Sequence, residues 1–176
     1  MDDMDTRPTE LSLFSGTGGG LLATQHRTVC YVEVDAYCQR VLQARIADGM
    51  LDDAPMWDDV RTFDGKPWRG CVDLLSAGFP CQPFTAAGKR IGEHDERNLW
   101  PETIRVIREV GPRWCLLENV PGLLAHGYFG TILGDLAESG FDVAWKVLSA
   151  AELGAPHKRD RLWIVSNAVG EGQSDT

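Results

Sequence analysis

Short apolar runs alternate along this chain with segments whose apolar positions recur at helical spacing. Helical spacing predicts helices at 36–48, 100–110 and 128–140; Pro101 lies in the first turn of the second, and Gly140 closes the third. Runs of β-branched, leucine and aromatic residues predict strands at 11–14, 29–34, 72–78, 114–120, 141–150 and 161–166, and a weak short strand at 56–60. This alternation predicts an α/β fold with a parallel, doubly wound sheet, whose last two strands are close enough in sequence to be antiparallel neighbours.

Length and composition fit a single domain. The chain has 176 residues, of which 43% are hydrophobic, enough for one substantial core but not for two full-sized domains. We expect the domain to span 11–167, between flexible tails at 1–10 and 168–176. No apolar run is long enough to cross a bilayer, and the acidic opening MDDMDTRPTE does not resemble a secretory signal, so we expect no membrane partner.

Charge and cysteine usage narrow the class of protein. The net charge of −9 argues mildly against nucleic acid as a partner, because phosphate binding usually leaves a basic footprint. The five cysteines form no CxxC pair, and the four histidines are isolated, so we expect neither a disulfide framework nor a metal site, and a reduced, cytoplasmic setting fits. We interpret four of the cysteines as small apolar packing residues: Cys30, Cys38, Cys71 and Cys115.

Polar and glycine residues gather where the predicted parallel strands end. Ligands of such sheets bind beyond the carboxyl ends of the strands. The first strand is followed by the sequence FSGTGGG, and the others are followed or ended by Glu33, by Asp58 and Asp59, by Cys81, and by Glu118 with Asn119. Each residue is a weak signal by itself, but their shared edge predicts a functional site there.

The glycine-rich loop and Glu33 are typical of a nucleoside-binding site. Glycines allow a tight turn and a close approach of backbone to ligand, and Glu33 lies 17 positions after Gly16, where an acid can bind ribose hydroxyls. The pattern G-x-G-G-G differs from G-x-G-x-x-G, so a pyrophosphate is not required, and S-adenosylmethionine needs the same close approach. A glycine-rich turn without a ligand is the alternative.

Cys81 stands between two prolines at the tip of a predicted strand. Packing, metal binding, redox chemistry and nucleophilic catalysis are all compatible with a lone cysteine in this place. The absence of nearby cysteine partners weakens the metal and redox interpretations. The acid at the end of the neighbouring strand, Glu118, favours the nucleophile over packing.

Four segments carry a family resemblance: LFSGTGG, GFPCQPFTAAGKR, ENVPGLL and GAPHKRDRLWIV occur in this order. With them the chain resembles the DNA cytosine-5 methyltransferases over about 11–167. The resemblance implies the class I S-adenosylmethionine-dependent methyltransferase fold, a Rossmann-like sheet that is mostly parallel with an antiparallel C-terminal strand and helices on both faces. It implies an intracellular enzyme of bacterial or phage type, with S-adenosylmethionine as cofactor and double-stranded DNA as partner.

The resemblance also implies roles for individual residues. The positions that match the cofactor site are Phe14, Ser15, Gly16, Gly18, Gly19, Glu33, Val34, Asp59, Val60 and Pro80. The positions that match the catalytic site are Cys81 as nucleophile, Glu118 against the cytosine ring, Asn119 in the loop geometry, and Arg159 and Arg161 at the target nucleotide. The positions expected to contact DNA are Gln82, Thr85, Lys89 and Arg90.

These residue types suit methylation at carbon 5 of cytosine. A thiolate that adds to carbon 6 makes carbon 5 nucleophilic, and arginines nearby favour the thiolate. Glu118 can supply a proton or a strong hydrogen bond at ring nitrogen 3 if a dry pocket keeps its carboxyl protonated, and Arg161 can hold the exocyclic oxygen. The base must be flipped out of the duplex, and we expect the loop 82–100 to close over it.

The sequence departs from the family pattern in two ways. His157 stands where the family usually has Gln. From the resemblance we also expect no counterpart here of the family's target-recognition domain or of the final helix that follows it, so a separate polypeptide that supplies target recognition is one expectation. Two alternatives to a DNA methyltransferase stay open: a tRNA cytosine-5 methyltransferase, and a non-catalytic remnant that binds cofactor or a partner.

Overall fold

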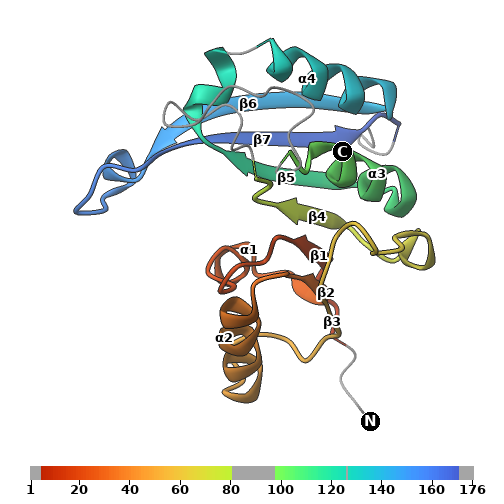
Figure 1. The fold of residues 1–176 in the computed structure, drawn as a ribbon, viewed down its shortest axis with the longest axis vertical. Helices are drawn as coiled ribbons and strands as arrows, with labels where there is room; N and C mark the ends of the chain where they lie inside the picture. Colours follow the sequence, from red (N-terminus) through yellow and green to blue (C-terminus); the bar gives the residue numbers. More distant parts are fainter. Residues whose placement is uncertain (1–4, 81–97, 126, 171–176) are drawn as a thin grey trace.

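A computed structural model describes residues 5–80, 98–125 and 127–170 of the chain. The described residues form a seven-stranded sheet in the order β3-β2-β1-β4-β5-β7-β6. The strands are β1 (Thr9–Leu13), β2 (Arg27–Val32), β3 (Met56–Trp57), β4 (Leu74–Ala77), β5 (Trp114–Asn119), β6 (Phe141–Ser149) and β7 (Asp160–Ala168). All neighbours from β3 to β5 are parallel, whereas β7 is antiparallel to both β5 and β6 (Figure 1).

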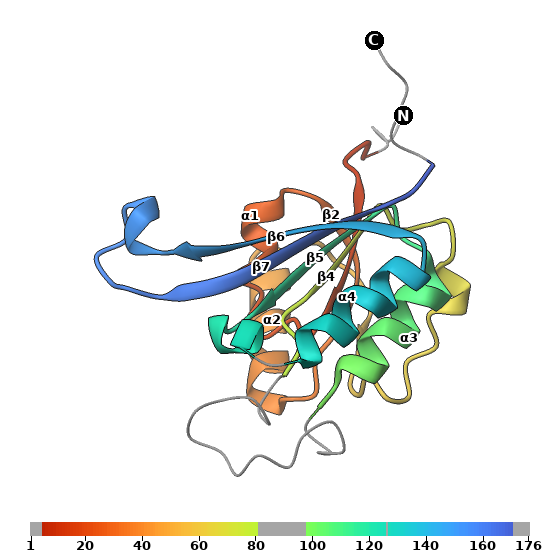
Figure 2. The same ribbon diagram turned by 90° about the horizontal axis from the view of Figure 1, so that it is seen from above.

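Helices cover both faces of this sheet. Figure 2 shows α1 and α2 on one face and α3 and α4 on the other. The α-helices are α1 (Leu21–Thr24), α2 (Ala36–Ala47), α3 (Trp100–Val110) and α4 (Tyr128–Glu138), and the short 3₁₀ turns are η1 (Lys66–Trp68), η4 (Pro121–Ala125) and η5 (Ala151–Leu153). The predicted mixed sheet of the class I methyltransferase fold, with helices on both faces, is confirmed.

Local sequence signals explain how the helices start and stop. The side chain of Asp35 accepts hydrogen bonds from two backbone N–H groups of the first turn of α2. Pro101 lies in the first turn of α3, where its missing N–H costs no hydrogen bond, and Gly111 ends this helix in a left-handed conformation (φ +59°). The bounds of α3 are those that the sequence predicted.

Several other bounds differ from the predictions. Strand β1 begins at Thr9, inside the segment predicted as a tail. Hydrogen bonds hold this start in place: the Thr9 N–H and hydroxyl donate to the Asp73 carboxylate, and the Arg27 N–H donates to the Pro8 carbonyl. Strand β7 runs to Ala168, and the weak strand β3 has only two residues. Helix α1 was not predicted, since a single turn is too short to show a helical period.

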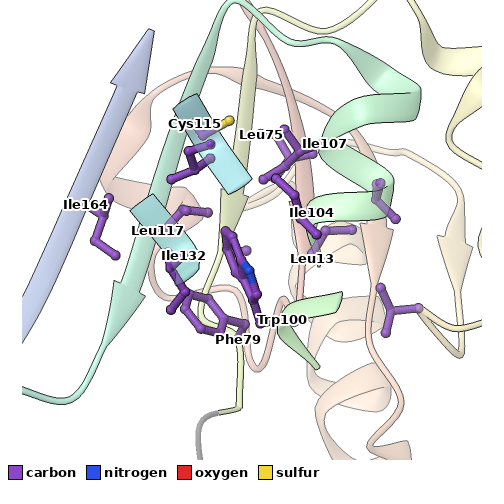
Figure 3. Packing of buried hydrophobic residues seen from close by; sticks show 14 of the residues in the cluster. Leu13, Leu75, Phe79, Trp100, Ile104, Ile107, Cys115, Leu117, Ile132 and Ile164 are labelled. Atoms are coloured by element: carbon purple, nitrogen blue, oxygen red, sulfur yellow. The ribbon is translucent and has the colours of Figure 1, made fainter. Parts of the chain in front are cut away.

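The main core lies between the sheet and helices α3 and α4. Figure 3 shows the strand residues Leu13, Leu75, Leu117 and Ile164 packed against the helix residues Ile104, Ile107 and Ile132. The Phe79 ring lies against Trp100 in the same cluster. Cys115 is fully buried here, and burial raises the pKa of its thiol to about 12, which makes it an inert packing residue. Cys30 is buried as well, but Cys71 is exposed, so its prediction as a packing residue was wrong.

Candidate active site

The glycine-rich loop follows β1 and has backbone conformations that residues other than glycine rarely adopt. Phe14, Gly16 and Gly18 all have positive φ, and the Gly18 N–H bonds the Ser15 carbonyl at 2.9 Å. A Cβ at Gly18 would lie 2.8 Å from Leu51 Cδ1 and 2.9 Å from Leu42 Cδ2, so no larger residue fits without a shift. The loop therefore needs glycine at position 18 for both its conformation and its packing.

Glu33 lies against this loop, as the order of the parallel strands predicts. It follows β2, is almost fully buried, and its carboxylate accepts the Gly16 N–H at 2.6 Å and the Asp35 N–H at 2.8 Å. Two carboxylate oxygens together have about four acceptor sites, so both bonds leave capacity for ligand hydroxyls. The next residue, Val34, is 67% exposed and offers an apolar surface beside the acid.

Asp59 and Val60 follow β3. The Asp59 carboxylate accepts the Arg61 N–H at 2.9 Å, and Val60 is buried in the main core. The Val60 carbonyl accepts a hydrogen bond from Nη2 of Arg105 on α3 at 2.7 Å. Sequence reasoning missed Arg105; its signal was the spacing of Glu102, Arg105 and Glu109 on one face of a helix.

Glu118 and Arg161 form an ion pair at the end of β5. Arg161 Nε lies 2.5 Å from Glu118 Oε1, with exposed side-chain fractions of 25% and 30%. The antiparallel pairing of β7 with β5, which sets Glu118 opposite Trp163, brings the two residues together. At this exposure the described residues do not by themselves supply the dry surroundings that proton donation by Glu118 requires.

Asn119 ties the end of β5 to the segment that follows β4. Its side-chain amide donates to the Phe79 carbonyl at 3.0 Å, and its amide oxygen accepts the Val120 N–H at 2.8 Å. Asn119 is buried, and the Phe79 ring packs on Trp100 with a centroid distance of 5.1 Å. These contacts hold the backbone that leads to Pro80.

A cavity of about 660 Å³ joins the glycine-rich loop to the acid and the arginines. Successive side chains of a strand point to opposite faces, and the polar strand residues that line the cavity, such as Ser12, Ser76 and Glu118, alternate with residues of the main core. Leu13 and Ala77 belong to the core and also border the cavity. Among its lining residues are Phe14, Ser15, Gly78, Glu118, Arg159 and Arg161. The cavity thus brings part of the predicted cofactor loop together with three predicted catalytic residues, whereas Glu33, Asp59 and Val60 lie outside its lining.

Some predicted residues fall outside the described part of the chain. They are the nucleophile Cys81 and the DNA-contacting Gln82, Thr85, Lys89 and Arg90. Pro80, directly before Cys81, is described and half-buried. Within residues 5–80, 98–125 and 127–170, no cluster of His, Cys, Asp and Glu could hold a metal ion, and no helix is long and apolar enough to cross a membrane.

Comparison with known proteins decides the family. A sequence model of the C-5 cytosine-specific DNA methylases matches residues 9–174. The chain belongs to this family. Membership confirms the resemblance that the PCQ, ENV and R-x-R segments indicated, and methyl transfer to cytosine is the chemistry of the family.

Curated members of the methylase family match over most of the chain. The type II methyltransferase M.NgoMIV of Neisseria gonorrhoeae is 36% identical over 164 residues, which cover 90% of this chain and 51% of the relative. The type II methyltransferase M.Eco47II of Escherichia coli is 37% identical over 180 residues, which cover 93% of this chain and 41% of the relative. The chain therefore spans about half the length of the curated relatives that it matches.

Solved structures confirm the fold. A DNMT2 variant from Spodoptera frugiperda matches with a TM-score of 0.76 and 22% identity, covering 96% of this chain and 52% of that one. A putative DNA modification methyltransferase encoded within an E. coli prophage matches with a TM-score of 0.72 and 23% identity, covering 92% of this chain and 47% of that one. At these identities the likeness shows the methyltransferase fold.

Proposed function

We propose that this chain transfers a methyl group from S-adenosylmethionine to carbon 5 of cytosine in double-stranded DNA, through a covalent adduct of Cys81 with a flipped base. The observation that carries the proposal is the Glu118–Arg161 pair in one cavity with the glycine-rich loop. An acid and a cation that converge at strand ends, beside a cofactor loop, suit a reaction that shifts charge on a bound ring. The chain's membership of the methylase family supports the choice of cytosine.

The residues present fit S-adenosylmethionine. The space beside Gly16 and Gly19 is open, so a ligand can approach the backbone there closely, and Glu33 retains acceptor capacity for ribose hydroxyls. Asp59, Val60 and Val34 would flank the adenine, and Pro80 with Phe14 would flank the reacting end. The cofactor supplies the methyl group as an electrophile. Side chains of this protein activate the cytosine ring and stabilise its charge.

Covalent catalysis makes carbon 5 reactive. The Cys81 thiolate adds to carbon 6 of cytosine, and the electron pair of the broken ring double bond makes carbon 5 a nucleophile. Carbon 5 takes the methyl group and then loses its proton to a base. The electron pair of that C–H bond restores the ring double bond as the sulfur–carbon bond breaks and the thiolate leaves.

Glu118, Arg161 and Arg159 would stabilise the charge that develops on the ring. Once the bound base and the cofactor exclude water from the cavity, Glu118 would donate a proton or a strong hydrogen bond to ring nitrogen 3, and its contact with Arg161 fixes the orientation of its carboxyl group. Arg161 would bind the exocyclic oxygen. Arg159, which also lines the cavity, would add positive charge near the substrate.

The DNA-contacting surface belongs to the same proposal. The target atom is buried in the duplex, so the cytosine must leave the base stack to meet the cavity. We assign contacts with DNA to Gln82, Thr85, Lys89 and Arg90, where the two basic residues would bind phosphates. A separate polypeptide would supply target recognition, which is compatible with the acidic charge of this chain.

Radiolabelled methyl transfer tests the proposal. Incubated with S-adenosylmethionine and duplex DNA, with and without a candidate recognition polypeptide, the chain should label cytosine at carbon 5, and Cys81→Ala should label nothing. Label that appears in tRNA alone would contradict DNA as the substrate. Cofactor binding without transfer under every condition would show a non-catalytic protein.

A further inference from the structure

Arg105 on α3 binds two backbone carbonyls of the loop that follows β3. Its Nη2 donates to the Val60 carbonyl at 2.7 Å, and its Nη1 donates to the Phe63 carbonyl at 2.9 Å. Both partners lie more than forty positions away in sequence, at separations of 45 and 42. The contact is therefore a tertiary one, between a helix and the loop that carries Asp59 and Val60.

Two acids on the same helix hold the Arg105 guanidinium in place. Arg105 Nε lies 2.8 Å from Glu102 Oε2, and Nη1 lies 2.9 Å from Glu109 Oε2. Burial by itself would lower the pKa of Arg105, but hydrogen bonds to the two acids outweigh burial and raise it. The guanidinium is thus charged, oriented, and shared between the helix and the loop.

The loop itself lies tightly on the helix. Glu109 Oε2 also accepts the Gly65 N–H at 2.9 Å, and a Cβ at Gly65 would lie 3.0 Å from Glu109 Cβ and from Val110 Cγ2. Val60 and Phe63 are buried in the main core. Since β3 pairs with the sheet through two residues only, contacts with α3 help to fix the position of Asp59 and Val60.

We propose that Arg105 is a positioning residue for the cofactor site, which holds Asp59 and Val60 at the place where they meet the adenine. The inference rests on the proposed function, because Asp59 and Val60 matter to the reaction only if the chain binds S-adenosylmethionine. Arginine suits this role because its planar fork donates to several acceptors in fixed directions. A lysine has one nitrogen and cannot reproduce both carbonyl bonds together with the two ion pairs.

Arg105→Lys tests the inference, and Arg108→Lys is the matched control. Arg108 lies on the same helix, but its side chain contacts Ser139 and Asp135 at the end of α4 and not the loop after β3. By calorimetry, Arg105→Lys should raise the Kd for S-adenosylmethionine about tenfold, which equals about 1.4 kcal/mol. Arg108→Lys should leave it within about twofold of the wild type, well under 1 kcal/mol. In turnover, Arg105→Lys should raise KM for the cofactor more than it lowers kcat.

Hydrogen exchange gives a readout that does not need the cofactor. The Thr62, Phe63 and Gly65 amides bond within the loop or to Glu109, and their exchange should quicken in Arg105→Lys but not in Arg108→Lys. Unchanged affinity and exchange in Arg105→Lys would overturn the inference, as would equal losses in both variants. If the wild type and Arg108→Lys bind no cofactor, the proposed function fails and the inference with it, which is a result distinct from a loss confined to Arg105→Lys.

Discussion

Glu10 is a carboxyl with no exposed surface on the cavity side of β1. Hydroxyl groups of Thr24 on α1 and Ser76 on β4 donate to its two oxygens. Burial raises the pKa of Glu10, although these hydrogen bonds act in the opposite direction, and His26 and Asp52 add smaller opposing effects. A single buried acid thus joins the helix after the glycine-rich loop to the strand that leads toward Cys81.

The raised pKa of Glu10 predicts a dependence of stability on pH. The folded protein binds this proton more tightly than the unfolded chain, so the stabilisation is complete below the ordinary value of 4.5 and is lost as pH rises through the folded value. The melting temperature of Glu10→Gln minus that of the wild type should therefore increase as pH rises from about 5 to 8. Thermal unfolding of both proteins at each pH measures this difference. A difference that does not change with pH would contradict the assignment.

The glycine-rich loop offers a second test at the scale of one residue. Gly18→Ala should destabilise the fold by about 1–3 kcal/mol, because the new methyl group meets Leu42 and Leu51 and the backbone has φ +79°. Gly19→Ala, next to it, has open space and should change the free energy of unfolding by less than about 0.5 kcal/mol. Urea denaturation of both variants measures the difference, and equal losses would count against the packing at Gly18.

The sequence was enough to predict the placement of site residues that lie at the ends of neighbouring parallel strands. Glu33 reaches Gly16 because β1 and β2 are parallel neighbours whose carboxyl ends meet. The spacing of Glu102, Arg105 and Glu109 indicates a charged helix face, but the contacts of Arg105 could not be predicted, since nothing local indicates which carbonyls a helix residue will meet 45 positions away. The family resemblance placed Arg161 and Glu118 at the same nucleotide, but their direct ion pair could not be predicted, because the pairing register of β5 and β7 sets it.

At the scale of elements, β5 and α3 together hold the two segments that the site needs. Asn119 at the end of β5 binds the Phe79 carbonyl, and Trp100 at the start of α3 packs on the Phe79 ring. Arg105, further along α3, holds the loop after β3. The fold class and the main strands could be predicted from apolar periodicity, but these connections between elements depend on side-chain contacts that periodicity does not encode.

Asn119→Ala should show what the connection from β5 contributes. The change leaves the buried Phe79 carbonyl without its donor, so we expect a loss of about 1–3 kcal/mol in the free energy of unfolding and a fall in methyl transfer. Asn167→Ala, on β7 and half-buried beside Trp114 at the opposite end of β5, should cost less than about 0.5 kcal/mol and keep activity. Urea denaturation and transfer assays on both variants check this, and a stable, fully active Asn119→Ala would refute the connection.

At the scale of the whole molecule, the proposal assigns chemistry to this chain and target recognition to a separate polypeptide. The chain belongs to the methylase family and carries the glycine-rich loop, Glu33, Glu118 and the arginines, yet it spans about half the length of its curated relatives. Its net charge of −9 is unusual for a protein that binds DNA by itself. The charge supports the proposal that affinity for DNA comes largely from another polypeptide.

A mechanism-based trap tests the central claim most directly. Duplex DNA that contains 5-fluorocytosine carries fluorine where the carbon-5 proton must leave, so the sulfur–carbon adduct cannot resolve after methyl transfer. With S-adenosylmethionine, and with the recognition polypeptide where one is needed, the wild type should form a complex that survives denaturing electrophoresis, and peptide mass spectrometry should locate the bond at Cys81. Cys81→Ala should form none. Methyl transfer to ordinary DNA without a trapped complex, or an adduct that persists in Cys81→Ala, would contradict the account.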